Sequence, residues 1–135
     1  MNVWSGGNYS HNTSGISSAS DGLVTVSSDW ASKGDESFLW EASTSQIKDL
    51  VRVSTDILEA GTWTLTMDVL NLSSAFVISF FSSTENQVRV TVPASNNVTN
   101  IELSITLTTE EFLSCRIVTS DAAKFLCDNI SIVNQ

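Results

Sequence analysis

The stretch TWTLTMDVLN, residues 62–71, decides the fold, because apolar and polar residues alternate along its whole length. Its apolar side chains share one face of an extended chain: Trp63, Leu65, Met67 and Val69. Threonines and an aspartate take the other face: Thr62, Thr64, Thr66 and Asp68. A period of two is typical of a β-strand with one face in a core and the other in water. The stretch therefore predicts a half-buried strand.

Similar alternation recurs on both sides of this strand. We expect eight further strands, at residues 23–30, 36–42, 50–55, 75–83, 87–92, 100–108, 112–119 and 124–133. The connections carry polar and turn-forming residues, such as Ala60-Gly61 and the residues that follow Pro93. Only the segment STSQIKD, residues 43–49, would allow a helical turn. Nine short strands separated by turns predict an all-β antiparallel β-sandwich of two sheets.

The composition fits one globular domain and argues against two kinds of partner. The chain has 135 residues, of which 41% are hydrophobic, and this length suits a single well-packed core. Six Lys and Arg against 15 Asp and Glu give a net charge of −9. Such a charge repels phosphate backbones and anionic lipid surfaces, so neither nucleic acid nor membrane insertion is expected.

Residues 1–20, MNVWSGGNYSHNTSGISSAS, are rich in Gly, Ser and Asn and predict an irregular N-terminal arm. The sandwich domain is expected over residues 21–135, beginning at the Asp21-Gly22 turn. The first residues lack the charged start and apolar stretch of a signal peptide. We therefore expect a piece of a larger multidomain protein, or a domain exported or assembled without its own signal.

From Asp21 to Val133 the chain resembles the jelly-roll carbohydrate-binding modules with a galactose-binding-like fold. The likeness is carried by successive phrases in the order DGLVTVSSDW, KGDESFLWEAS, LVRVSTDILEAGTWTLTMDVLN, QVRVTVPAS and FLCDNISIV. Modules of this kind are appended to glycan-degrading enzymes, adhesins and phage tail proteins. The resemblance implies a sugar site on the concave sheet or at the loop tips, and an extracellular, cell-surface or virion-associated location.

The resemblance also implies one structural calcium ion at the edge of the sandwich. Asp128 matches the acidic ligand of the last strand, and the turn Lys33-Gly34-Asp35 resembles the ligand-bearing turn of such modules. No carboxylate precedes Asp21, so one usual ligand has no counterpart, and carbonyl groups or water would have to complete a coordination shell of oxygens. The sequence leaves calcium open.

Sugar binding needs an aromatic or apolar face against the pyranose ring and planar polar groups that hydrogen-bond its hydroxyls. Side chains of these kinds that strand phase does not commit to the core are the candidates: Trp4, Tyr9, Trp30, Arg52, Gln87 and Arg89. Asp68 and Asn71 are further polar candidates. For each arginine the alternative is an exposed charge that keeps the surface soluble, and for Trp30 it is packing at the core edge. For Trp4 and Tyr9 the alternative is a clasp that holds the arm against the sandwich.

Other aromatic residues are expected to serve packing. Trp40 and Trp63 lie in phase with neighbouring apolar residues and predict core positions. Leu39 and Phe81 fall out of phase and are expected to be exposed. Cys115 and Cys127 are expected to be buried thiols. Their predicted strands are expected to be neighbours across the turn at 120–123, which leaves a disulfide open.

Catalysis finds little support in the residues. The single histidine, His11, lies in the arm, and no nucleophile motif accompanies it. Adjacent carboxylates, as at Glu110-Glu111, point to opposite faces of a strand and do not flank one bond. We therefore expect no enzyme, and the resemblance implies a non-catalytic domain that binds a poly- or oligosaccharide. The alternative is a structural or adhesion domain that makes protein contacts in a phage tail or cell-surface protein.

Overall fold

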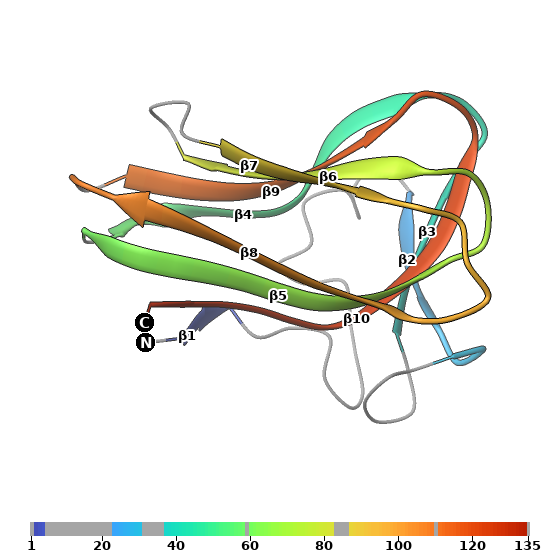
Figure 1. The fold of residues 1–135 in the computed structure, drawn as a ribbon, viewed down its shortest axis with the longest axis horizontal. Helices are drawn as coiled ribbons and strands as arrows, with labels where there is room; N and C mark the ends of the chain where they lie inside the picture. Colours follow the sequence, from blue (N-terminus) through green and yellow to red (C-terminus); the bar gives the residue numbers. More distant parts are fainter. Residues whose placement is uncertain are drawn as a thin grey trace.

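The computed structural model describes residues 2–4, 23–30, 37–58, 60–82, 87–109 and 111–134. Side chains are described for these residues except 2–4, 49, 51–58, 111, 112 and 134. This part of the chain is built from strands in two antiparallel sheets that face each other (Figure 1). In it, no helix is long and apolar enough to cross a membrane.

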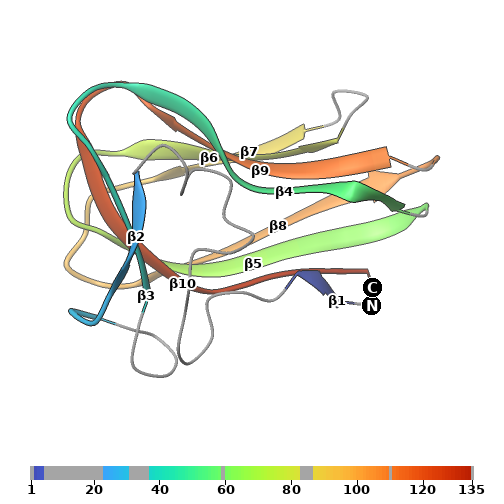
Figure 2. The same cartoon turned by 180° about the vertical axis from the view of Figure 1, so that it is seen from behind.

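The larger sheet has six strands. In spatial order its path runs through β2 (Val24–Ser27), β3 (Ser37–Ala42), β10 (Ala123–Asn134), β5 (Gly61–Asn71) and β8 (Thr99–Leu107), and β1 (Asn2–Trp4) pairs with β10. The smaller sheet has four strands, in the order β4 (Gln46–Leu58), β9 (Glu111–Thr119), β6 (Phe76–Ser82) and β7 (Gln87–Val92). Seen from behind, β4 lies at one edge of the smaller sheet and β10 runs along the larger one (Figure 2).

All nine expected strands are present, and the all-β sandwich is confirmed. Two local predictions were wrong. The segment 43–49, in which a helical turn was allowed, instead leads into β4 at Gln46, because Ile47 and Lys48 pair with Val118 and Ile117 of β9. The arm expected to be irregular throughout contains β1, in which Asn2 pairs with Val133. Pairing with a neighbouring strand overrode the local pattern in both segments.

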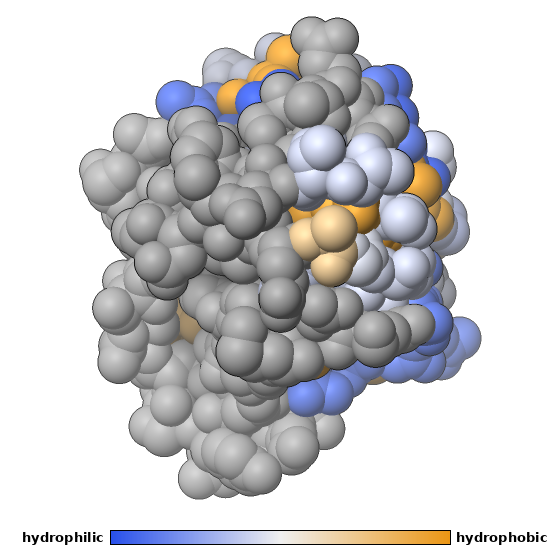
Figure 3. Space-filling model, turned by 90° about the vertical axis from the view of Figure 1, so that its left-hand side faces the viewer, coloured by the Kyte–Doolittle hydropathy of each residue, from blue (hydrophilic) through white to orange (hydrophobic). Residues whose placement is uncertain are grey.

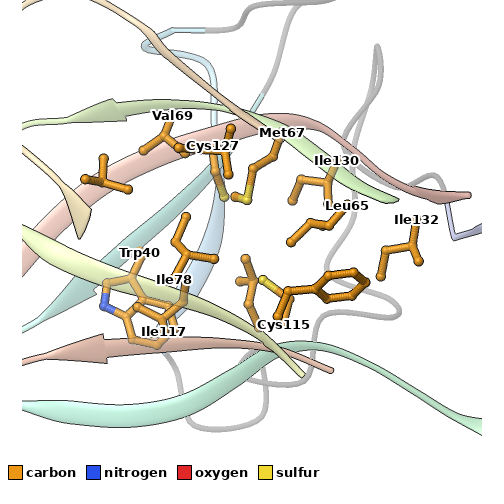
Figure 4. Close-up of a cluster of buried hydrophobic side chains, with 14 of the residues drawn as sticks. Trp40, Leu65, Met67, Val69, Ile78, Cys115, Ile117, Cys127, Ile130 and Ile132 are labelled. Atoms are coloured by element: carbon orange, nitrogen blue, oxygen red, sulfur yellow. The ribbon is translucent and has the colours of Figure 1, made fainter. Parts of the chain in front are cut away.

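Residues from both sheets form one core (Figure 4). Trp40 and Trp63 are fully buried, which confirms the prediction for both. Phe125 of β10 stacks on Trp40 with ring centroids 5.6 Å apart, and on Phe76 of β6 with centroids 4.2 Å apart. Because Phe76 belongs to the smaller sheet and Trp40 to the larger one, Phe125 joins the two sheets through aromatic contacts.

The two cysteines occupy this core from opposite sides. Cys115 lies on β9 of the smaller sheet and Cys127 on β10 of the larger sheet, and both are buried thiols that form no disulfide (Figure 4). The expectation that their strands are neighbours was wrong, because the chain changes sheets between β9 and β10. The prediction of buried thiols is confirmed.

The outer face of the larger sheet carries a ladder of small polar side chains. Hydroxyl pairs link Thr62 to Thr106 at 3.2 Å and Thr64 to Ser104 at 2.8 Å. Beyond the pair of Thr66 and Glu102, Asn100 Nδ2 donates to Asp68 Oδ1 at 2.6 Å. Cross-strand pairs of this kind stabilise a sheet and occupy the hydrogen-bonding groups of its surface.

Candidate functional site

The outer face of the smaller sheet holds a groove of about 700 Å³. The described residues that line it come from all four strands: Ile47, Ser79, Phe81, Ser82, Gln87, Arg89, Arg116 and Val118. An end-on view shows hydrophobic and hydrophilic residues next to one another along the upper edge, where the smaller sheet lies in Figure 1 (Figure 3). The groove therefore offers both kinds of surface to a ligand.

Strand register explains why these side chains meet. Ser79 of β6 is the backbone partner of Arg116 on β9 and of Arg89 on β7. Two residues along, Phe81 is the partner of Ser114 and of Gln87. Side chains two residues apart on a strand point to the same face. The two arginines therefore flank Ser79, and this row lies beside the row of Phe81.

Two contacts hold the polar groups of the groove in place. The guanidinium of Arg116 lies over the ring of Phe81, 4.5 Å from its centroid, within the range of a cation–π interaction. The hydroxyl of Ser79 donates to Oε1 of Gln87 at 3.1 Å. Ser79 is only 4% exposed, so this bond also satisfies a hydroxyl that has little access to water.

Apolar side chains form the rest of the groove. Ile47 is 66% exposed, an unusual exposure for an isoleucine on a strand, and it is the backbone partner of Val118. A second, shallower hollow continues from these two residues toward the end of the sheet, where Thr119 Oγ1 accepts a bond from the Gln46 amide. The apolar surface therefore extends beyond the polar rows.

Sequence reasoning found part of this site. Gln87 and Arg89 line the groove, as does Phe81, which was expected to be exposed and is partly buried. Arg52 is the backbone partner of Ser114 on the same sheet, and its side chain lies outside the described part. Leu39 is also partly buried.

The three aromatic candidates are not among the groove residues that the structure describes. Trp30 is partly buried after the end of β2, and no described residue of the groove adjoins it in sequence. The backbone of Trp4 belongs to β1 and pairs with Ile132, while its side chain is not described. Tyr9 lies outside the described residues.

One polar candidate was misplaced, and five of the described groove residues were missed: Ile47, Ser79, Ser82, Arg116 and Val118. In FLSCRIVT, Arg116 lies between Cys115 and Ile117. Because alternation places these two neighbours on the core face, it predicts that Arg116 faces outward. Ile47 fell within the segment in which a helical turn was allowed. Asn71 is buried on the core side of β5, where its amide donates to the Val92 carbonyl at 3.1 Å. Asp68 lies on the larger sheet, away from the groove.

The candidate calcium ligands are described only in part. Asp128 is fully buried in β10, just before an irregular step in the pairing with β5 at which Asn129 has a φ of 53°. Lys33 and Asp35 lie outside the described residues. Within the described ranges, no three His, Cys, Asp or Glu side chains gather as a metal site.

No family model and no curated protein matches the sequence. Solved structures do match the fold. A family 61 carbohydrate-binding module in complex with β-1,4-galactotriose is 15% identical, with a TM-score of 0.60 over 95% of this chain and 99% of that chain. The N-terminal tandem of family 22 modules from Xyn10C of Paenibacillus barcinonensis is 12% identical, with a TM-score of 0.69 over 99% of this chain and 44% of that chain.

A third match comes from a virus. The enzymatically active domain of tailspike protein 4 of bacteriophage CBA120 is 14% identical, with a TM-score of 0.58 over 83% of this chain and 18% of that chain. This chain thus corresponds to one module in the longer chains and to nearly the whole of the isolated family 61 module. At these identities the likeness shows a shared fold: the chain has the β-sandwich fold of carbohydrate-binding modules.

Proposed function

We propose that the domain binds carbohydrate without converting it, in the groove on the outer face of the smaller sheet. The observation that carries the proposal is the lining of that groove, in which exposed apolar side chains adjoin planar polar ones. Ile47 and Val118 offer a surface for the C–H face of a sugar ring. Arg89, Arg116 and Gln87 offer N–H donors for its hydroxyls.

The contacts within the groove favour binding because they hold its polar groups before a ligand arrives. Phe81 supports the Arg116 guanidinium, and the bond from Ser79 fixes the amide oxygen of Gln87. Side chains that are already positioned lose less conformational entropy when a ligand binds. A shallow groove of this kind suits one stretch of a sugar chain that continues beyond it at both ends.

Similar folds occur as parts of longer chains, and this supports a targeting role. A family 22 module and a catalytic module form one chain in a Clostridium thermocellum xylanase, complexed with xylohexaose, of which this chain covers 28% at 12% identity and a TM-score of 0.67. We infer that this domain likewise belongs to a larger protein and directs it to a glycan surface outside the cell or on a virion. No step of this role requires catalysis.

A second function is favoured by a different surface. The larger sheet presents small hydroxyl side chains that bond to one another, as between Thr62 and Thr106. Such a face has few groups left to hold a sugar but packs easily against another protein. This favours a structural or adhesion role through protein contact. The bacteriophage tailspike protein, which contains a similar fold, supports this second candidate.

Calorimetric titration tests the carbohydrate proposal. We expect saturable binding of at least one oligosaccharide at concentrations up to about 10 mM in a panel of β-1,4-galactan, xylan and uronic-acid-containing chains. Phe81→Ala should weaken that binding by about tenfold, because it removes apolar surface and the support of Arg116. Repeating the titration with calcium and with a chelator tests the proposed ion near Asp128.

A matched control comes from the opposite sheet. Thr106→Val removes a hydroxyl from the outer ladder without touching the groove, so it should leave sugar binding unchanged. If no chain in the panel binds with or without calcium, the carbohydrate proposal is wrong. If Thr106→Val weakens binding as much as Phe81→Ala does, the site is not in this groove.

A further inference from the structure

The positive charge of this acidic protein is concentrated on one sheet. The chain has three arginines, at positions 52, 89 and 116, and a net charge of −9. All three belong to strands of the smaller sheet, β4, β7 and β9. In the rows of Ser79 and Phe81, backbone pairing brings in one acidic residue, Asp49, which is the partner of Arg116. Two of the three arginines, Arg89 and Arg116, line the groove.

The polar lining of the groove consists mainly of donors. None of its eight described lining residues is an aspartate or a glutamate. Gln87 already uses its amide oxygen to accept the bond from Ser79, which leaves its NH₂ group as the part that donates. Arg89 and Arg116 donate only, because a guanidinium has no acceptor. Such a lining complements a ligand group that only accepts hydrogen bonds.

The spacing of the arginines fits one such group between them. Arg89 and Arg116 are both backbone partners of Ser79, on its two sides, so their Cα atoms stand two strand spacings apart, about 10 Å. Long arginine side chains reach a common ligand across this distance. A guanidinium presents a planar fork that matches a carboxylate in two parallel hydrogen bonds.

We propose that the groove is selective for sugars that carry a carboxylate, and that Arg89 and Arg116 bind this carboxylate above Ser79. The inference rests on the proposed carbohydrate-binding function and names its ligand class. Uronic acid residues within a polysaccharide have the required chemistry. The apolar residues Ile47 and Val118 then contact the sugar ring beside the carboxylate.

Matched pairs of oligosaccharides test the proposal. Oligogalacturonate and glucuronate-substituted xylan oligosaccharides are titrated beside their carboxyl-reduced forms, which keep the same length and linkages. We expect at least one carboxylated chain to bind about tenfold more tightly than its reduced form, as the strength of charged hydrogen bonds suggests. This preference should shrink when NaCl is raised from about 50 mM to about 500 mM, because salt screens charges in an open groove.

Substitutions at the two arginines test which residues cause the preference for carboxylated chains. Arg89→Gln and Arg116→Gln should each abolish most of the preference, and Arg89→Lys, which keeps the charge without the fork, should retain part of it. Lys124→Gln is the matched control, because it removes one positive charge from an exposed ion pair with Glu41 on the other sheet. It should leave the preference unchanged.

The two proposals fail in different ways. Equal or weaker binding of the carboxylated forms overturns the carboxylate inference and leaves carbohydrate binding in place. A preference that survives both glutamine substitutions overturns the assignment to Arg89 and Arg116. If neither the charged nor the reduced oligosaccharides bind, the proposed carbohydrate function itself is wrong.

Discussion

Phe125→Ala should lower the free energy of unfolding by about 3 to 5 kcal/mol, the loss expected when a large aromatic side chain is removed from a core. Phe125 is fully buried and stacks on Trp40 within its own sheet and on Phe76 of the facing sheet. The substitution therefore leaves a cavity where the two sheets meet. Since a domain has about 5 to 15 kcal/mol of stability in total, this one change removes a large part of it.

Urea unfolding followed by tryptophan fluorescence measures the loss. Phe125→Leu keeps most of the volume but not the ring stacking, and it should cost about 1 to 2 kcal/mol. Leu72→Ala is the matched control, because Leu72 is half exposed and its truncation should change stability by no more than about 0.5 kcal/mol. If Phe125→Ala costs no more than Leu72→Ala, the aromatic stack does not hold the sheets together.

The fold could be predicted from the sequence because the alternation of apolar and polar residues is a local pattern that recurs in one strand after another. In β5, residues 63, 65, 67 and 69 are all buried, as the alternation in TWTLTMDVLN predicts. The same period located β6 through β10 to within about two residues, which is the usual uncertainty of strand ends. Because one face of each strand is buried, every second residue along the strand is apolar.

What the sequence did not show depends on pairing between strands. No property of STSQIKD predicts that Ile47 will face Val118; this follows only when β4 and β9 become neighbours. Cys115 and Cys127 are close in sequence yet belong to different sheets, because the chain changes sheets between them.

Prediction of the candidate site was limited by strand pairing in the same way. Arg89 was recognisable as an outward side chain, and Arg116 was too by the same phase. That both flank Ser79 is set by the order β9-β6-β7, which no local pattern encodes. Outward direction is therefore predictable residue by residue, whereas the composition of a groove needs the topology.

Alkaline pH should weaken the fold through Cys127. Burial raises the pKa of the Cys127 thiol far above its usual range, and the charges of Cys115 and Asp128 raise it further. In the unfolded chain the thiol ionises near pH 8.5, while in the folded protein it keeps its proton. Above that pH the unfolded state binds fewer protons than the folded state, so the free energy of unfolding falls as pH rises.

The expected fall is about 1.4 kcal/mol for each pH unit above the thiol pKa of the unfolded chain, or about 2.5 kcal/mol between about pH 8 and pH 10.5. Other groups also titrate in this range, so the measured quantity is the difference between wild type and Cys127→Ala in urea unfolding at each pH. The cavity left by the substitution lowers stability by a similar amount at every pH. The pH dependence is what separates the two effects: the wild-type curve should descend toward that of Cys127→Ala and then cross or meet it. Parallel curves across the whole range would mean that the folded protein does not keep this thiol protonated.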